Sequence, residues 1–279
     1  MNRRKTLYVS DLDGTLLRGD ETLSPFTIQT VNQLTEQGML FSYATARSHV
    51  TAGKITEKMT PQIPVIVYNG AFILPNGGGK PLRACYFQPK EAQYILELLN
   101  GRGIFPIVYA TIEGKEKFSY WPEQLNGGMK AFLKSRKGDI RENPTDRAGL
   151  GQGKLFYFTC IDQPERLGPV YALLKDRFQC VYHRELYTGE QWLEVMPRQA
   201  TKAQAVLELK ERLGCQKVVC FGDGINDLPM FAAAEEGYAV ANACQALKDA
   251  ASAVIDSAEQ DGVAKKLLEL WNKEREKIV

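Results

Sequence analysis

The chain has 279 residues, of which 44% are hydrophobic and 24% charged, and its 35 basic residues nearly balance 33 acidic ones to leave a net charge of +2. A charge so close to zero argues against a broad electrostatic surface for nucleic acid or membrane lipid. Length and composition together predict an ordinary soluble protein of one or two domains.

The sequence shows none of the features of a secreted or membrane protein. The apolar stretch after MNRRK is interrupted by Asp11, and no run approaches the roughly 20 apolar residues of a membrane span. Six scattered cysteines form no CxxC pair, and with only two histidines they argue against a zinc site. We expect a cytoplasmic protein, and nothing in the sequence indicates a nucleic-acid, membrane or obligate protein partner.

The first seventy residues alternate between expected strands and expected helices. Ser24 is suited to cap a helix that begins at Pro25, and Gly38 is suited to end it. This alternation predicts parallel strand pairing in an α/β sheet. The expected strands span 6–10, 39–45 and 63–70, and the expected helices span 24–38 and 48–59.

After residue 70 the pattern changes to paired strands interleaved with helices, which predicts a separate α+β module. The segment GLGQGK (149–154), at the end of a polar, glycine-containing region near 137–153, lacks the spacing and the Ser or Thr of a phosphate-binding loop, so we interpret it as a linker. The module is expected to contain a hairpin at 71–87, helices at 90–103 and 164–178, and strands at 104–110, 116–121, 154–161, 180–186 and 191–196.

Past Pro197 the simple alternation returns. The expected elements are a helix at 201–214, a strand at 217–223, a helix at 225–234, a strand at 237–242 and two further helices. The predicted fold class is therefore α/β, a Rossmann-like parallel-sheet core formed by 1–83 and 194–279, with an inserted α+β domain at 84–193.

Acidic residues follow two of the predicted core strands. Asp11 and Asp13 come directly after the first strand, and Asp223 and Asp227 follow a late strand in the same way. The carboxyl ends of parallel strands share one edge of an open sheet, where ligands bind. Clustered carboxylates repel one another unless a cation lies among them, and oxygen ligands favour a hard ion such as Mg²⁺.

Other strand ends carry groups suited to a phosphoryl group. Thr45 and Arg47 follow the second strand, Asn69 and Gly70 follow the third, and Lys202 lies in the first turn of a helix. A hydroxyl, an ammonium and oriented backbone donors can stabilise the charge of a transferring phosphoryl group. An aspartate can attack phosphorus, and a second carboxyl two residues later can serve as acid and then as base.

Four segments, DLDGT, TAR, the lysine at 202 and GDGINDLPM, match in order the motifs of the haloacid dehalogenase superfamily. The long insertion resembles the large α+β (C2B-type) cap domain of the Cof-type subgroup, and the resemblance runs from residue 7 to the terminal helices. It implies the following roles in this sequence: Asp11 as nucleophile, Asp13 as acid and base, Thr45 and Lys202 on the phosphate, and Asp223 and Asp227 around Mg²⁺, with the backbone carbonyl of Asp13 as a further ligand. We also expect Asp11 to contact the metal. The residues expected at the substrate are Arg47, Asn69, Gly70 and Asn226.

The resemblance implies a Mg²⁺-dependent phosphatase that hydrolyses small phosphomonoesters, such as sugar phosphates or similar metabolites, through an aspartyl phosphate. One alternative is a phosphomutase or phosphotransferase, and another is a phospho-accepting signalling module of the receiver type. Receivers lack an inserted domain and lack a carboxyl two residues after the nucleophile, so Asp13 and the insertion favour an enzyme. Tyr109, Arg184 and Tyr187 are candidates for contact with the leaving group, but each could equally have a core or surface role.

Overall fold

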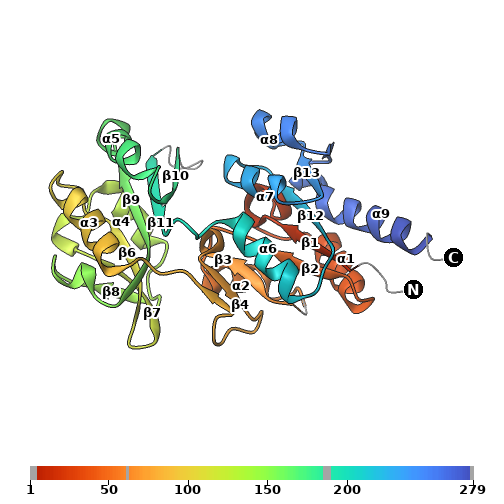
Figure 1. The fold of residues 1–279 in the computed structure, drawn as a ribbon, viewed down its shortest axis with the longest axis horizontal. Coiled ribbons are helices and arrows are strands. Elements are labelled where there is room, and N and C mark those ends of the chain that lie inside the picture. The colour runs from red at the N-terminus through yellow and green to blue at the C-terminus, as the bar shows by residue number, and fades with distance from the viewer. Residues whose placement is uncertain (1–4, 61–62, 185–189, 277–279) are drawn as a thin grey trace. The chain divides into compact units, whose positions relative to one another are not determined.

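The computed structural model describes residues 5–60, 63–184 and 190–276. Its internal contacts divide the chain into two compact units, which we call the core unit (Met1–Ala84 and Ala200–Val279) and the inserted unit (Cys85–Gln199). In Figure 1 the core unit takes the two ends of the colour scale, red to orange and turquoise to blue, and the inserted unit takes the middle of the scale. The core unit is therefore built from two segments that are far apart in the sequence.

A five-stranded, all-parallel sheet forms the centre of the core unit (Figure 1). Leu7 pairs with Val218 on one side and with Leu40 on the other, and all five residues of its strand, Thr6–Ser10, are buried. Continuous apolar strands of this kind are typical of parallel sheets that are covered on both faces. In spatial order the strands are β14 (Ala253–Ile255), β13 (Glu236–Val240), β12 (Lys217–Gly222), β1 (Thr6–Ser10) and β2 (Leu40–Tyr43).

A small antiparallel sheet extends the core unit beyond β2. It consists of β3 (Val65–Val67), β4 (Phe72–Leu74) and β5 (Arg83–Ala84), in that order. A parallel bridge between Ala44 and Ile66 links it to the main sheet. The hairpin expected at 71–87 is present in β4 and β5, but these strands belong to the core unit because they pair with β3.

The first helix of the core unit begins at Pro25, as the sequence indicates, whereas the helix expected at 225–234 begins only at Leu228. Ser24 caps α1, its Oγ accepting a hydrogen bond from the backbone N–H of Thr27 at 2.9 Å. Trp271 of the last helix is buried, and its Nε1 donates to Oε1 of Gln37 just after α1. The helices are α1 (Pro25–Glu36), α2 (His49–Thr56), α6 (Lys202–Arg212), α7 (Leu228–Ala232), α8 (Gln245–Ala250) and α9 (Gly262–Glu276).

The inserted unit has a six-stranded mixed sheet. Every neighbouring pair is antiparallel except β7 with β8. In spatial order the strands are β10 (Gln179–Arg184), β11 (Gln191–Met196), β9 (Lys154–Asp162), β6 (Ile107–Ile112), β7 (Lys115–Tyr120) and β8 (Glu142–Pro144).

Three helices pack on this sheet (Figure 1). Helices α3 (Pro89–Asn100) and α5 (Pro164–Leu174) bury apolar residues in one cluster with Leu193 of β11. The ring of Phe132 in α4 (Gly127–Lys134) instead contacts that of Trp192, with centroids 5.4 Å apart. Successive residues of a strand point to opposite faces, so α4 covers the face opposite to α3 and α5.

The predicted fold class, a parallel-sheet core with an inserted α+β domain, is confirmed. Helix α4 and the short strands β8 and β14 were not expected. Segment 145–153 is a loop between β8 and β9 inside the inserted unit, so it does not link two domains. None of the helices among the described residues combines the length and the apolar character needed to cross a membrane.

The inserted unit ends later than the sequence predicted. A boundary at residue 193 would cut through β11, whereas that whole strand pairs with β10 and β9 and the contacts place the boundary after Gln199. The alternating pattern of a strand gives no sign of which of two sheets it will join, so this boundary depends on long-range pairing.

We expect Leu193→Ala to lower the free energy of unfolding by about 2–5 kcal/mol, because Leu193 is fully buried in the apolar cluster of the inserted unit. The exposed Arg198, beyond β11, provides the control, and Arg198→Ala should stay within about 0.5 kcal/mol of wild type. Urea denaturation followed by circular dichroism measures both. Equal effects would mean that β11 does not contribute to the packing of the inserted unit.

Candidate active site

Asp11 lies at the carboxyl end of β1. Its backbone N–H continues the sheet by donating to the carbonyl of Phe221 at 2.9 Å, and its side chain is only 8% exposed. Among the described residues, both partners of the carboxylate contact Oδ1, namely the N–H of Leu12 at 2.7 Å and Nζ of Lys202 at 2.8 Å. Oδ2 of Asp11 thus has no hydrogen-bond partner among the residues that the structure describes.

Lys202 joins two segments of the acidic group. Its Nζ lies 2.8 Å from Oδ1 of Asp11 and 2.8 Å from Oδ1 of Asp227, and its side chain is 1% exposed. Thr201 caps the helix that begins at Lys202, since its Oγ1 accepts from the N–H of Gln204. Burial alone would lower the pKa of Lys202, but the charges of the two aspartates raise it, so the ammonium stays protonated.

Asp227 is fully buried and is bound from two directions. While Oδ1 accepts from Lys202, Oδ2 accepts from the backbone N–H groups of Asp223 and Gly224, both at 3.1 Å. The carboxylate of Asp227 packs against Gly222, where a Cβ would lie 2.7 Å from Oδ2 of Asp227. This position therefore leaves no room for a side chain. Asp227 therefore shapes the loop that follows β12 as well as contributing charge.

Asp11, Asp223 and Asp227 each place a carboxylate oxygen within 4.8 Å of the other two. Burial raises the pKa of Asp11 well above its ordinary value, and the neighbouring aspartates add to this effect while Lys202 opposes it. Burial likewise raises the pKa of Asp223 to about 6, against the hydrogen bond from Thr15. Three carboxylates and one ammonium leave a net charge of −2 when all are ionised.

Asp13 turns toward Arg47. Nε of Arg47 donates to Oδ1 and Oδ2 of Asp13 at 3.0 and 2.9 Å, and Nη2 of the same guanidinium lies 3.0 Å from Oε2 of Glu21. The side chain of Asp13 is 46% exposed, unlike that of Asp11. Two carboxylates that are separated by a single residue thus have different surroundings and different cationic partners.

Two loops bring the remaining predicted residues to the same end of the sheet. Thr45 is fully buried, its Oγ1 accepts from the N–H of Arg47 at 3.1 Å, and its carbonyl accepts from the N–H of Asn69 at 2.9 Å. Gly70 has φ +96°, and a Cβ there would lie 2.2 Å from the carbonyl oxygen of Thr201. Only glycine permits this close approach, which places the loop after β3 against the start of the lysine helix.

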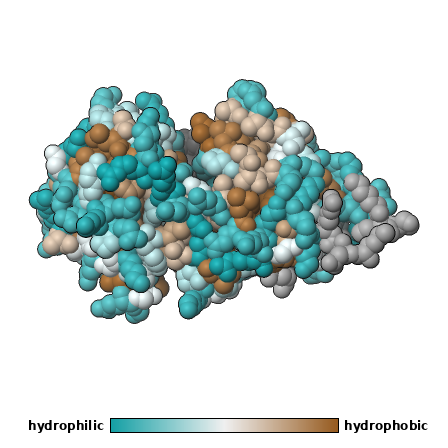
Figure 2. Space-filling view, in the orientation of Figure 1, coloured by the Kyte–Doolittle hydropathy of each residue, from teal (hydrophilic) through white to brown (hydrophobic). Residues whose placement is uncertain are grey.

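Asn226 lies in the turn Ile225–Asp227, and its Oδ1 is 2.5 Å from the position that a Cβ on Gly224 would occupy. Figure 2 shows hydrophobic side chains gathered over α7, and Ile225, in the turn before this helix, is 69% exposed.

In the inserted unit, Tyr109 is buried and Arg184 is exposed at the end of β10, whereas Tyr187 lies outside the described residues. None of these observations assigns a contact to a leaving group.

A family model for haloacid dehalogenase-like hydrolases matches residues 8–267. The chain belongs to this family. The chain is 25% identical to 5-amino-6-(5-phospho-D-ribitylamino)uracil phosphatase of Bacillus subtilis, over 98% of this chain and 100% of that protein. It is 27% identical to HMP-PP phosphatase of Serratia proteamaculans, over 92% of each chain.

Among solved structures, a haloacid dehalogenase-like hydrolase from Bacteroides thetaiotaomicron has a TM-score of 0.78 at 22% identity, over 96% of this chain and 100% of that one. This likeness supports the fold. The predicted membership of the superfamily and the predicted enzyme class, a phosphatase of that superfamily, are confirmed by the family model and the related phosphatases.

Three polar residues of this haloacid dehalogenase-like site were not predicted. Thr15 donates to Oδ1 of Asp223 at 2.7 Å, Glu21 contacts Arg47, and Asn242 donates to the carbonyl of Gly14 at 2.7 Å. Thr15 lies inside the DLDGT segment and Asn242 follows β13, so the rule that ligands gather at strand ends could have found both. No local pattern marks Glu21, because it reaches the site from an exposed turn.

The residues present fit a hard divalent cation. Every side-chain donor in the acidic group is a carboxylate oxygen, and the net charge of −2 that remains beside Lys202 matches one such ion. The loop that carries Gly14 also accommodates the carboxylate of Asp223. A Cβ at Gly14 would lie 2.5 Å from Oδ2 of Asp223, so any larger residue there would collide with this oxygen.

In the presence of a chelator, we expect the ionisation of Asp223 to lower the melting temperature as the pH rises from 4 to about 6. The native state holds the proton of Asp223 up to about pH 6, whereas the unfolded chain releases it near the ordinary value of 3.8. Folding therefore binds a proton in this window, and stability decreases as the pH increases. Differential scanning calorimetry across this range measures the slope.

Asp223→Asn provides the matched comparison, because the amide keeps the shape and can still accept from Thr15. The variant should show a shallower slope, and Asp11 and Glu194, whose pKa values burial also raises, contribute to the slope that remains. Identical slopes in the two proteins would contradict the raised pKa of Asp223.

Proposed function

We propose that this protein is a Mg²⁺-dependent phosphatase of small phosphomonoesters, with Asp11 as the nucleophile. The observation that carries the proposal is the state of the Asp11 carboxylate. Lys202 and the N–H of Leu12 hold Oδ1, and no described residue binds Oδ2. One oxygen is oriented and the other is available to attack phosphorus.

In the first step, Oδ2 of Asp11 forms a bond to phosphorus as the bond to the ester oxygen breaks. Asp13 then acts as the general acid that gives this oxygen its proton. In the second step, Asp13 takes a proton from water as that water attacks the aspartyl phosphate, which releases inorganic phosphate and restores Asp11. Because Asp13 is ion-paired with Arg47 here, the pair has to open when substrate arrives.

The other residues would hold the phosphoryl group. The Thr45 hydroxyl accepts from Arg47 N–H, so its own proton is available to a phosphoryl oxygen, and Lys202 supplies a buried positive charge. Asn69 and Gly70 present their loop at the same end of the sheet, where Arg47 and Asn226 could also contact substrate. Asp11, Asp223, Asp227 and the backbone carbonyl of Asp13 would hold Mg²⁺, which would neutralise phosphoryl charge when bound.

The substrate class rests on the relatives. Two of them are named for different small phosphorylated molecules, which supports a small phosphorylated metabolite without selecting one. A phosphomutase or phosphotransferase uses the same first step, but the acceptor in the second is a hydroxyl group of substrate and no inorganic phosphate is released. The predicted cytoplasmic location stays a prediction.

We expect Asp11→Asn to reduce phosphate release at least about a thousandfold, because the amide keeps the shape but cannot attack phosphorus. Asp13→Asn should instead retain the first step on aryl phosphates, whose leaving group needs no proton, and then stall. Rapid-quench assays with p-nitrophenyl phosphate should show a burst of nitrophenol close to the enzyme concentration for Asp13→Asn and none for Asp11→Asn.

A burst in the Asp11→Asn variant would remove this residue as nucleophile. For Asp13→Asn, an equal loss on aryl and alkyl phosphates, with no phosphorylated protein trapped by acid, would contradict the acid and base role. Product analysis on the wild type separates the alternatives, since a mutase or transferase yields a new phosphate ester instead of inorganic phosphate.

Mg²⁺ should raise the melting temperature of the wild type, since a ligand at 100 times its Kd adds about 2.7 kcal/mol to stability. Asp223→Ala should lose most of this shift, because it removes one of the three carboxylates of the acidic group. Asp13→Asn is the control and should keep the shift, since its side chain lies with Arg47 and only its carbonyl is a proposed ligand. Equal shifts in wild type and Asp223→Ala would rule out the proposed metal site.

A further inference from the structure

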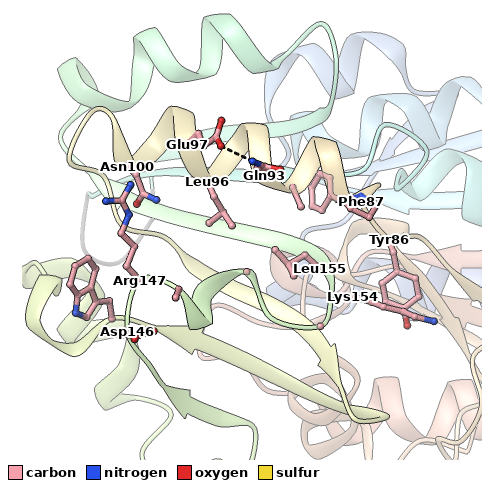
Figure 3. A pocket seen from close by; sticks show the side chains of 16 residues that line it. Tyr86, Phe87, Gln93, Leu96, Glu97, Asn100, Asp146, Arg147, Lys154 and Leu155 are labelled. Carbon is pink, nitrogen blue, oxygen red and sulfur yellow. Dashed lines mark hydrogen bonds between the residues drawn. The ribbon is translucent and has the colours of Figure 1, made fainter.

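A cavity of about 930 Å³ lies wholly within the inserted unit. Figure 3 shows it between the helix α3 and the strand and loop that carry Leu155 and Arg147. Leu155 belongs to the apolar cluster that α3 and α5 cover, so the cavity is on that face of the sheet. None of its lining residues belongs to the core unit, which holds the candidate catalytic residues.

The inner wall of the cavity is apolar. Phe87 and Leu155 line it while remaining 6% and 3% exposed, and Leu96 projects from α3 between them and the far end (Figure 3). Small-molecule sites are typically concave and mostly apolar, with volumes of about 300–1,000 Å³. The size and the lining thus suit a drug-sized molecule with an apolar body.

One end of the cavity carries polar groups that lack partners. Oδ1 of Asn100, at the end of α3, is buried and makes no hydrogen bond to any described residue. Buried amide oxygens are normally hydrogen-bonded, and exchanging the amide oxygen and nitrogen would leave a donor in the same position. A molecule in the cavity can supply the missing partner.

A cation lies at the same end. The side chain of Arg147 extends toward Asn100 (Figure 3), and within the described residues it forms no ion pair or hydrogen bond. The two acidic residues that line the cavity, unlike Arg147, each have a hydrogen-bond partner. Glu97 accepts from Gln93 at 2.8 Å, and Asp146 accepts from the N–H of Gly149 at 2.9 Å. The guanidinium is therefore free to bind an anion in a bidentate manner.

We propose that this cavity is a binding site for a small amphipathic anion. Its apolar, flat body lies against Phe87, Leu96 and Leu155, and its carboxylate, sulfonate or phosphate group lies at Arg147, beside the amide of Asn100. The segment GLGQGK, which showed no phosphate-loop spacing, forms part of the wall through Gly151, Gly153 and Lys154. The proposal is independent of the phosphatase mechanism, since none of these residues belongs to the candidate active site.

The test uses 8-anilinonaphthalene-1-sulfonate, a fluorescent probe with a flat apolar body and one anionic group, and its neutral analogue N-phenyl-1-naphthylamine. The full chain should bind the sulfonate saturably, with a rise in fluorescence. Arg147→Gln should weaken the sulfonate about twofold to fivefold, the range for one exposed ion pair, and leave the neutral analogue unchanged. Lys137→Gln removes an exposed charge outside the lining and should change neither.

Gly151→Phe tests the cavity itself. A Cβ at Gly151 would lie 3.6 Å from Cδ1 of Leu96, an ordinary contact distance, so a phenyl ring can enter the cavity without displacing backbone. We expect both probes to bind at least about tenfold more weakly, which corresponds to 1.4 kcal/mol. Gly127→Phe adds the same ring at an exposed glycine of the same unit and should have no effect.

Unchanged binding in Gly151→Phe, with a wild-type circular dichroism spectrum, would overturn the proposal. So would an equal loss of both probes in Arg147→Gln, since the guanidinium would then not be selecting an anion. Phosphate release should be the same in wild type and Gly151→Phe, so the outcome does not depend on whether the proposed catalytic function is correct.

Discussion

The buried ammonium of Lys202 is the interaction on which the acidic site depends. Placing Asp11, Asp223 and Asp227 within 4.8 Å of one another concentrates like charge in a region that water scarcely reaches. Lys202 binds two of the three at 2.8 Å and is itself stable there only because it is paired. The group is thus held together without a metal, and it keeps a net charge of −2 that can bind a cation.

This arrangement requires distant segments to approach closely, and glycines make that possible. Gly70 lies against the backbone of Thr201, Gly14 leaves room for the Asp223 carboxylate, and Gly222 does the same for Asp227. At each position an added Cβ would come within 2.2 to 2.7 Å of another atom. The positive φ of Gly14 and Gly70 also excludes most other residues. These glycines therefore allow the loops to turn tightly and the charged side chains to lie close together.

Much of the core and of the site could be predicted because both follow local rules. Alternating apolar strands and capped helices indicate a parallel sheet, and the carboxyl ends of its strands place Asp11, Asp223 and Asp227 together before any distance is known. Segments whose partners are remote could not be assigned in this way. The last strand of the insertion, β11, carries no local mark of the sheet that it joins, and only its pairing with β9 and β10 assigns it to the inserted unit.

The choice of partner for each charge is the other feature that spacing does not determine. Asp11 and Asp13 are two residues apart, yet one is buried with a lysine and the other is 46% exposed with an arginine that also binds Glu21. In a mechanism with two carboxylates, this difference suits the roles, because a nucleophile must be held still and an acid that later becomes a base must move between leaving group and water. The Asp13 carboxylate is 46% exposed, so water can replace Arg47 as its partner when the pair opens. Sequence spacing brings the groups to one rim, and burial then distinguishes the enclosed carboxylate of Asp11 from the exposed carboxylate of Asp13.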